Sequence, residues 1–401
     1  MIKLSLRQIR IYGIMEYTTI GESCSVVSGG TPSRSKTEYW RNGTIPWIKI
    51  GNIKSKYVNE YDELITEQGL NNSSAKLLKK GTILYTIFAT LGEVGILDTE
   101  ACTNQAIAGI NINDPRITTD YLYYYLKSKK DYVNNIGRGV AQNNINLTTL
   151  KKFEIPLINV DKQLYIVEVL EKVERMIGLK KKEIDDLDLL IKARFIELFG
   201  TVRENPYKYP TATLKEVCHK ITDGKHGGCE QEENSGYYYI GAREIYDGEI
   251  HYDTAPQIKY TDFSKDYRRC NIEQGDMVIV NTGATIGKSA IASSSLTERT
   301  LLQKSVALIK VKPNIISAEF LRYCYMANPS MYMVESASAQ PNLLLSKINT
   351  TVIYLPPMDL QLQFADFVQQ VDKSKFNSLI PHKYDKYHQF MLVVSLLYIF
   401  I

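Results

Sequence analysis

The chain has 401 residues, a length that predicts two or three domains. With 44% hydrophobic and 23% charged residues, the composition excludes a disordered or collagen-like chain and leaves enough apolar material for a core. The 48 Lys and Arg residues against 44 Asp and Glu residues give a formal net charge of +4. Any contact with nucleic acid must therefore depend on where the cations lie rather than on their total.

The first part of the chain predicts short strands separated by turns, followed by helices. Residues 83–88 are β-rich and lie between glycine-containing turns. A tyrosine-rich helix is expected over residues 119–131, and its tyrosines at this spacing are more often core than contact surface. A polar Gln/Asn loop and a short strand ending at Pro156 complete this part. Such a mixture of helices and strands indicates an α+β protein.

A heptad pattern predicts a long helix over residues 161–199. Apolar residues recur at alternating spacings of four and three, which is typical of a coiled-coil seam. Asp161 is the expected N-cap and Gly200 the expected stop, while Lys180 and Arg194 need a wet or polar environment in the seam. At 1.5 Å per residue the helix would be about 55–60 Å long, more than a domain of about 150 residues requires. We expect this helix to contribute to a helix–helix and partner interface through Ile166, Leu170, Val173, Ile177, Ile184, Leu187, Ile191 and Leu198.

Short motifs of the first half recur in the second half, in the same order and at a shift that drifts only from 194 to 200 positions. Any one match is weak, but seven in register indicate an internal duplication. The period is far longer than the roughly 20–50 residues of a solenoid repeat, so the repeated unit is a whole domain followed by a helix. The matched segments are 19–22 with 213–216, 81–84 with 275–278, 89–92 with 284–287, 104–105 with 302–303, 141–144 with 339–342, 155–157 with 355–357, and Gln163 with Gln363.

The second copy departs from the first near the C-terminus. Its heptad pattern is lost after Lys375, and Pro381 ends any helix. Residues 390–401 are mostly apolar but too few to span a membrane, and they have neither helical nor strand periodicity. We therefore expect a gene product that is truncated or altered at its C-terminus. The interface residues expected from its shortened second helix are Phe364, Phe367 and Val371.

Several motifs accompany this arrangement of domain, long helix, domain and helix. They are Gly-Gly-Thr-Pro-Ser-Arg at 29–34, Glu-Tyr-Trp at 38–40, the segment 45–53, Ala-Thr-Leu-Gly at 89–92, the loops with Gln142 and Gln340, and Pro356-Pro357 followed by Gln361 and Gln363. Over roughly residues 15–375 the chain resembles the specificity subunit of type I restriction–modification systems. The resemblance implies two target-recognition domains, each reading one half of a split DNA site, spaced by two antiparallel helices.

The predicted fold is thus α+β, with two homologous α/β target-recognition domains separated by long coiled-coil-type helices in a pseudo-twofold internal duplication. We expect the first recognition domain at residues 1–158, a long spacer helix at 159–200 and the second recognition domain at 201–357. A shortened second spacer helix at 358–380 and a divergent apolar tail at 381–401 would follow.

The resemblance also implies a function and partners. The chain would be a non-catalytic subunit that reads a bipartite, asymmetric site on double-stranded DNA. It would direct methylation and restriction by modification (methyltransferase) subunits and, through them, restriction subunits, although the shortened second helix predicts weak or lost assembly. Two alternatives are a self-contained nuclease or methyltransferase with fused recognition domains, and a scaffold that binds no DNA. The reading loops vary among such proteins, so the sequence predicts no recognised bases.

The sequence lacks complete catalytic, metal and cofactor motifs. Residues 283–289 match a phosphate-binding loop only in part, because Thr282 stands where its leading glycine is required. The spacing of the Cys and His residues at 218–229 matches no usual zinc site, and no His lies beside a convincing nucleophile. Asn-Pro-Pro-aromatic, the motif of amino-methyltransferases, is missing as well. We expect no catalytic residue, metal or cofactor. Six scattered cysteines and the lack of an apolar signal core predict free thiols, no membrane contact and a cytoplasmic location.

Cations and amides in the predicted loops are the candidate DNA contacts. Arg and Lys hold phosphates or read guanine edges, and Asn or Gln reads adenine. Any one of these residues is more often a solvated surface group than a contact, so only the set is a prediction. It comprises Arg34, Lys36, Lys49, Lys54, Arg138 and Asn143 in the first half, and Lys225, Arg243, Lys288 and Lys304 in the second.

Overall fold

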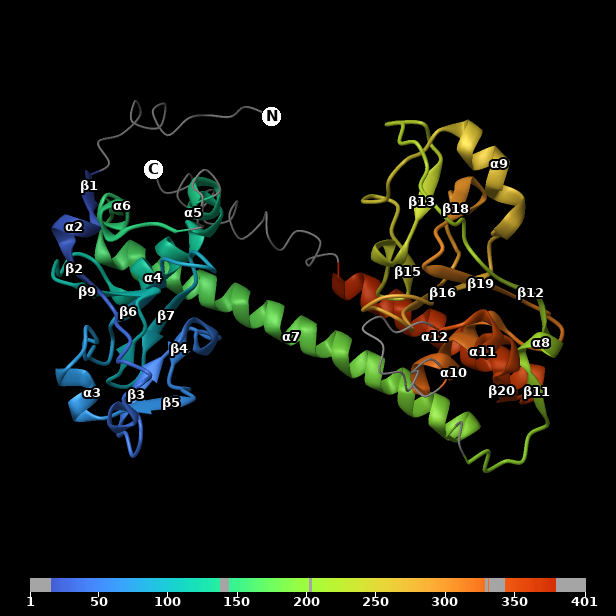
Figure 1. Ribbon diagram of the computed structural model, residues 1–401, viewed down its shortest axis with the longest axis horizontal. Helices are drawn as coiled ribbons and strands as arrows, with labels where there is room; N and C mark the ends of the chain where they lie inside the picture. The colour runs from blue at the N-terminus through green and yellow to red at the C-terminus, as the bar shows by residue number, and fades with distance from the viewer. Residues whose placement is uncertain (1–15, 138–143, 202–203, 329–330, 332–342, 380–401) are drawn as a thin grey trace. The chain divides into compact units, whose positions relative to one another are not determined.

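The computed structural model describes residues 16–137, 144–201, 204–328, 331 and 343–379, and the chain divides into two compact units (Figure 1). The described part of the first unit ends at Leu179, and the second begins at Lys180. Each unit combines helices with small sheets, as the sequence predicts for an α+β protein. No described helix is long and apolar enough to cross a membrane.

The first unit is organised around a five-stranded sheet of order β2-β9-β6-β7-β4. A smaller sheet of order β5-β3-β8 contains a parallel pair, β3 and β8, while β1 and β10 pair antiparallel. The strands are β1 (Glu16–Thr19), β2 (Cys24–Ser28), β3 (Ile45–Ile48), β4 (Tyr57–Val58), β5 (Glu63–Ile65), β6 (Ile83–Thr86), β7 (Val94–Leu97), β8 (Cys102–Thr103), β9 (Ile107–Ile112) and β10 (Glu154–Leu157). The helices are α2 (Ile20–Ser23), η1 (Thr37–Tyr39), η2 (Ile50–Asn52), α3 (Glu67–Asn71), α4 (Thr119–Ser128), α5 (Lys130–Gly137), α6 (Leu147–Lys151) and α7 (Val160–Phe199).

The main core of the first unit lies between the large sheet, α4 and the first turns of α7. Tyr85 and Ile110 of the sheet, Tyr121 of α4, and Ile166 and Leu170 of α7 belong to one buried cluster. The tyrosine-rich helix predicted over 119–131 is therefore α4, continued by α5, and the tyrosine rings of α4 form core rather than surface.

The second unit has a four-stranded sheet of order β12-β19-β16-β17 and a separate parallel pair, β13 and β18. Two antiparallel pairs, β11 with β20 and β14 with β15, complete its described strands. The strands are β11 (Thr211–Thr213), β12 (Cys218–Asp223), β13 (Tyr238–Ile240), β14 (Ile245–Tyr246), β15 (Glu249–Ile250), β16 (Met277–Val280), β17 (Ser289–Ile291), β18 (Thr300–Leu302), β19 (Val306–Val311) and β20 (Val352–Tyr354). The helices are α8 (Leu214–Val217), η3 (Ala242–Glu244), α9 (Tyr260–Cys270), η4 (Thr297–Arg299), α10 (Ala318–Ala327), α11 (Leu345–Thr350) and α12 (Met358–Leu379).

Hydrogen bonds confirm the internal duplication. Thr19 and Glu22 form a capping box at α2, and Thr213 and Glu216 form the same box at α8. The residue after each threonine also makes the same contact: Ile20 N donates to Phe153 O, and Leu214 N donates to Thr351 O, each at 3.0 Å. The two domains thus repeat one backbone plan, although α3 has 5 residues where α9 has 11.

The structure corrects the predicted alignment of the two copies near their C-terminal ends. Thr18 pairs with Ile155 and Ala212 with Ile353, so the shift there is 198 rather than 200. A slip of two residues leaves a strand residue on the same face, which is why sequence alternation could not exclude it. On the helix the same slip changes the face: Gln361 is buried and is the counterpart of Gln163, whereas Gln363 is exposed.

A one-residue correction applies to the pair 104–105 and 302–303. Asn104 N donates to Ile48 O at the end of β3, and Gln303 N donates to Ile240 O at the end of β13. Asn104 therefore corresponds to Gln303, not to Leu302. The predicted match followed the shared glutamine letter, while the backbone bonds follow the strand ends.

Helix α7 begins one residue before the predicted helix and ends at the predicted residue, Phe199. Gly200 follows with φ of +73° and donates its N–H to Ile196 O, which is the expected left-handed helix stop. Of the seam residues, Ile166, Leu170 and Ile191 are buried, and Val173, Ile177, Ile184, Leu187 and Leu198 are half-buried.

Towards its end, the buried stripe of α7 departs from the predicted seam. The buried residues are Ile191, Phe195 and Phe199, spaced by four, whereas the heptad places Arg194 and Leu198 in the seam. A straight α-helix drifts relative to a strict seven-residue repeat, and this drift brings the two phenylalanines to the core.

Helix α12 packs against this stripe through Phe364, Val368 and Val371, with Phe367 half-buried. Phe364 contacts Phe195 and Phe199, each at a ring-centroid distance of 5.5 Å, and Lys375 forms an ion pair with Asp188 at 2.7 Å. Because the residue numbers rise along one helix as they fall along the other, the two helices are antiparallel.

Candidate nucleic-acid interface

In each unit, the loops that carry most of the predicted DNA contacts leave three neighbouring strands at the same end. In the first unit these strands are β2, β3 and β8, and Gly30 N donates to Thr103 O at 2.8 Å. In the second unit they are β12, β13 and β18, and Lys225 N donates to Leu302 O at 2.7 Å. Lys225 therefore occupies the place of Gly30.

Close backbone packing fixes both loops on their strands. A Cβ atom on Gly29 would lie 2.2 Å from Asn104 O, and one on Gly224 would lie 2.2 Å from Leu302 O. Distances below 3.0 Å to a backbone atom require the backbone to move. Only glycine allows the loop to lie this close to the neighbouring strand.

Arg34 is held by aromatic rings and a carboxylate on the first of these loops. Its Cζ lies 3.6 Å from the ring centroid of Trp40 and 5.0 Å from that of Trp47. Its guanidinium contacts a carboxylate oxygen of Glu63 at 2.6 Å. Such stacking, combined with an ion pair, limits the rotamers available to an arginine.

The two indoles also anchor the loop itself. Trp40 Nε1 donates to Ser33 O at 3.1 Å, and Trp47 Nε1 donates to Gly30 O at 3.0 Å. Thr31 adds a hydrogen bond to the side chain of Gln105, which follows β8. The loop that presents Arg34 is thus held at three points.

Lys49 shares the Glu63 carboxylate with Arg34. Lys49 Nζ donates to Glu63 Oε1 at 2.9 Å and lies 3.6 Å from Asp62. The hydrogen bond from Lys49 to Glu63 raises the lysine pKa. Burial alone would raise the pKa of Glu63, but the bonds from Lys49 and Arg34 outweigh it and lower that pKa. Arg34, Lys49, Asp62 and Glu63 together carry no net charge.

Lys36 and Lys54 have other partners and do not join this cluster. Lys36 Nζ donates to the Tyr39 hydroxyl at 2.9 Å, and the exposed Lys54 lies 3.6 Å from Glu60. The predicted contacts Arg138 and Asn143 fall outside the described residues.

A second cluster of predicted contacts lies at the equivalent place in the second unit. Lys304 N donates to Lys225 O at 3.0 Å, which brings these two lysines together. Lys225 Nζ is half-buried and pairs with Asp266 of α9 at 2.5 Å. Arg243 lies in η3, directly after the loop that packs on Gln303. Within the described part of the chain, Arg243 and Lys304 are exposed and have no ion-pair partner.

Lys288 is the predicted contact that stands apart from these clusters. It belongs to the turn between the antiparallel strands β16 and β17, where Gly287 N donates to Val280 O at 2.9 Å. The same turn in the first unit has Gly92 N donating to Thr86 O at 3.1 Å. A phosphate-binding loop connects a strand to a helix, so residues 283–289 form a hairpin turn instead.

The sequence did not reveal the acidic partners of these cations. Glu63 lies 29 positions from Arg34, and Asp266 lies 41 positions from Lys225. Trp40 and Trp47, the two tryptophans of the chain, were a composition signal that could have pointed to the Arg34 loop.

Among the described residues, these loops contain no group of side chains suited to bind a metal ion. Within the described ranges, the His, Cys, Asp and Glu side chains form no group of three or more that could hold a metal ion. His226 bonds to Asp223 at 2.8 Å, and Cys218 is buried. All six cysteines are free thiols.

Comparison with known proteins assigns this architecture. A family model described as the type I restriction modification DNA specificity domain matches the chain twice, over residues 14–189 and 206–383. The chain belongs to this family. Its two domains are therefore DNA specificity domains of the type I restriction–modification kind, which supports the non-catalytic subunit over a self-contained nuclease or methyltransferase.

Two curated relatives agree with this assignment. The MjaIX specificity subunit of Methanocaldococcus jannaschii is 26% identical over 391 residues, covering 92% of this chain and 88% of the relative. The EcoR124I/EcoR124II specificity subunit of Escherichia coli is 29% identical over 170 residues, covering 41% of this chain and 42% of the relative.

Solved structures agree on the fold. The S subunit of a type I restriction–modification system from M. genitalium has a TM-score of 0.53 at 18% identity, with 96% of both chains covered. A structure described in terms of complex assembly and conformational transition of the type I system has a TM-score of 0.58 at 16% identity, covering 95% of this chain and 96% of that one.

Proposed function

We propose that this chain reads a bipartite, asymmetric site on double-stranded DNA, one half-site with each unit. It directs methylation by modification subunits and, through them, restriction by restriction subunits. Such a role places the chain in the cytoplasm, where the DNA and the partner subunits are. The recognition domains are residues 1–158 and 201–357, and α7 and α12 serve as the spacer helices at 159–200 and 358–380.

The duplicated loop site with unlike side chains is the observation that carries the proposal. The backbone bonds at the strand ends are the same in both units, but Gly30 is replaced by Lys225, Lys49 by Gly241, and Asn104 by Gln303. A shared frame with different donors and acceptors suits two readers of different base sequences.

Helix α7 supports the bipartite part of the proposal. Its 40 residues correspond to about 60 Å of helix. One turn of B-form DNA is about 34 Å, so a connection of this length can carry two readers on separate turns of the duplex. A mild net charge of +4 means that partner subunits must supply much of the phosphate neutralisation.

Mapping of methylated bases tests the proposal. The full chain is expressed with modification subunits of its own system, and the DNA of the host is sequenced for methylated adenine. We expect one bipartite motif that disappears when the gene is deleted. Exchange of residues 18–155 with those of a relative should change one half of that motif only. Methyl transfer or cleavage by the purified chain alone, with S-adenosylmethionine and magnesium, would overturn the proposal.

Point variants give a finer test of the second reader. Arg243→Ala combined with Lys304→Ala should reduce methylation of the second half-site by at least tenfold, because both cations are exposed and unpaired within the described residues. Lys215→Ala, on the exposed side of α8, is the matched control and should leave methylation unchanged.

A further inference from the structure

Both units contain a buried glutamine in the first turn of the helix that follows the recognition domain. Gln163 lies in α7 and Gln361 in α12, and both have 0% exposed surface. Burial of an amide costs free energy unless its donors and acceptor are hydrogen-bonded. The same face of each helix is otherwise apolar. Ile166 and Phe364, each three residues after the glutamine, belong to the core.

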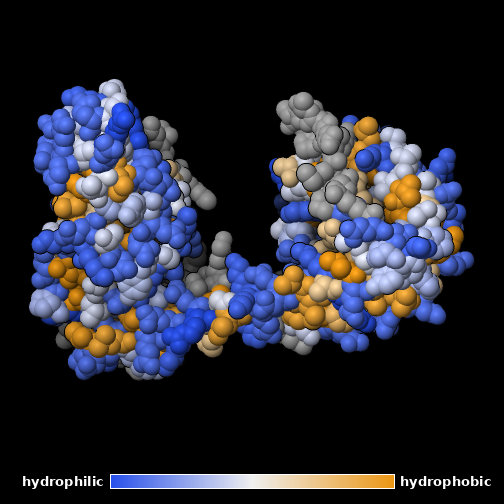
Figure 2. Space-filling model, turned by 90° about the horizontal axis from the view of Figure 1, so that it is seen from below, coloured by the Kyte–Doolittle hydropathy of each residue, from blue (hydrophilic) through white to orange (hydrophobic). Residues whose placement is uncertain are grey.

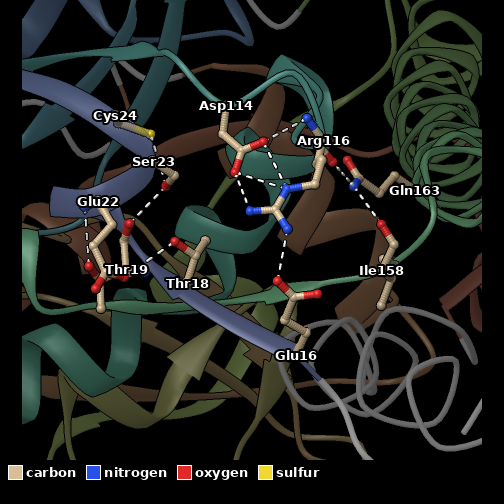
Figure 3. A network of polar contacts seen from close by, with 10 residues as sticks. All are labelled: Glu16, Thr18, Thr19, Glu22, Ser23, Cys24, Asp114, Arg116, Ile158 and Gln163. Atoms are coloured by element: carbon tan, nitrogen blue, oxygen red, sulfur yellow. Dashed lines mark hydrogen bonds and ion pairs between the residues drawn. The ribbon is translucent and has the colours of Figure 1, made fainter.

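In the first unit, Gln163 is hydrogen-bonded to two other segments of backbone, and Figure 3 shows its contacts with Arg116 and Ile158. Its Oε1 accepts hydrogen bonds from Thr118 N at 2.9 Å and Thr118 Oγ1 at 3.1 Å. Its Nε2 donates to Arg116 O at 2.6 Å and to Ile158 O at 2.9 Å. One side chain on α7 thus binds the loop that enters α4 and the chain that leaves β10.

In the second unit, Gln361 makes the same connections with different neighbours. Its Oε1 accepts from Ser317 N at 2.8 Å, and its Nε2 donates to Ile315 O at 3.3 Å and Pro356 O at 2.9 Å. Ser317 is the N-cap of α10, as Thr118 is the N-cap of α4. The two joints agree although most residues around them differ.

Further polar contacts reinforce the joint of the first unit. Arg116, whose carbonyl accepts from Gln163, is held by Asp114 and Glu16, each at 2.8 Å (Figure 3). Lys56, with a side chain 14% exposed, pairs with Asp120 of α4 and Glu171 of α7, both at 2.6 Å. These bonds resist rotation of α7 against the domain, because each one couples the helix or its joint to a different segment.

A fully bonded buried amide specifies one orientation, whereas an apolar side chain would allow several packings of similar free energy. We infer that Gln163 and Gln361 are positioning residues, which fix the angle between each recognition domain and its spacer helix and thereby set the number of base pairs between the two half-sites. The inference rests on the proposed function and names a determinant of its spacing.

The length of α7 makes spacing sensitive to this angle. Over about 60 Å of helix, a tilt of about 10° at the Gln163 joint displaces the far end by about 10 Å. That displacement corresponds to about three base pairs at 3.4 Å each. A joint that loses its hydrogen bonds should therefore accept several spacer lengths.

The test uses the full chain assembled with its modification subunits and a DNA library in which the two half-sites are separated by every spacer within four base pairs of the natural one. Gln163→Met and Gln361→Met remove the hydrogen bonds at similar volume, and Gln163→Asn keeps the amide but shortens its reach. Gln363→Met, on the exposed face of α12, is the matched control. Methylation of each library member is counted by sequencing.

We expect the variants at 163 and 361 to methylate the same half-site bases, to lose about tenfold at the natural spacing, and to accept at least two additional spacer lengths. Gln363→Met should behave like the unaltered chain. If the Met variants do not fold, Gln163→Asn decides the question. A drop in methylation or thermal stability with an unchanged spacer preference would overturn the inference and leave the proposed function intact. Failure of the unaltered chain to select any bipartite site would overturn the proposed function instead.

Discussion

The two units attach the same domain plan to helix α7 by different means. The first unit uses ion pairs around a short apolar contact, with Lys56 bound to Asp120 and Glu171 beside Ile166 and Leu170. The second unit uses a cluster of aromatic rings, to which Phe195 and Phe199 of α7, Phe320 of α10 and Phe364 of α12 belong. Both joints keep the buried glutamine and the strand pairing, whereas the side chains packed around them differ.

The largest expected effect comes from the aromatic cluster. Phe199→Ala removes a fully buried ring that contacts Phe320 at a centroid distance of 4.8 Å. We expect a loss of about 3–5 kcal/mol from the free energy of unfolding of the second unit. Calorimetry should then show two transitions, with the first unit melting at its original temperature. Ile196→Ala, half-exposed on the same helix, should change stability by less than about 0.5 kcal/mol.

The ion-pair joint should be less sensitive. Lys56→Met leaves Asp120 and Glu171 without their shared cation, but both carboxylates are 39% and 43% exposed and remain hydrated. We expect the first unit to lose about 1 kcal/mol, reduced further by salt. Urea unfolding at low and high ionic strength measures this loss. Lys54→Met, at an exposed pair, is the control, and an equal loss there would contradict a special role for the joint.

The loops that carry Arg34 and Lys49 should show a smaller effect. It concerns DNA binding rather than stability, and it is a gain rather than a loss. Glu63→Gln releases Arg34 and Lys49 from a shared carboxylate, so we expect binding of nonspecific DNA to strengthen about three- to tenfold at low salt. The dependence of log K on log salt should steepen by about one unit. Fluorescence anisotropy with a labelled duplex measures both quantities. Glu60→Gln, beside the exposed Lys54, is the control.

The capping boxes should respond equally in both units. Hydrogen bonds from the backbone N–H groups of Thr19 and Thr213 lower the pKa values of Glu22 and Glu216 below their usual value. A carboxyl with a lowered pKa stabilises the fold above its unfolded pKa, and this stabilisation disappears as the pH falls through the folded pKa. Melting temperatures of Glu22→Gln and Glu216→Gln should therefore converge with that of the unaltered chain as the pH falls from 7 to 3. Convergence in one unit only would show that the two boxes are not equivalent.

Periodic features of this molecule could be predicted, and long-range ones could not. The heptad pattern located α7 to within one residue, because apolar spacing and the left-handed Gly200 are local signals. The buried Phe195 and Phe199 were missed because the heptad and the true helical period separate by about 20° per repeat, which amounts to about one residue position over five repeats. The face of the molecule in Figure 2 is mostly hydrophilic, with scattered apolar patches.

The candidate site illustrates the same limit. Most of the predicted cations in the described ranges gather at the strand ends, because loops after strands can be located from turn residues. Their pairing with Glu63 and Asp266 depends on tertiary contacts, which no local pattern encodes. The alignment of Gln163 with Gln363 failed for a related reason, because a two-residue slip preserves the alternation of a strand. The strand register of the structure and the burial of Gln361 reveal the slip.

The close seating of Gly29 and Gly224 bears on how new specificities can be built. Main-chain bonds and the two closely packed glycines hold both loops, and side-chain bonds of Trp40, Trp47 and Thr31 add to this in the first unit. A combinatorial library at positions 34, 36 and 49, or at 225, 243 and 304, would vary the reading groups on an unchanged scaffold. Each half of the molecule is in this sense a separate platform for directed evolution, with the two glycines as the positions to leave untouched.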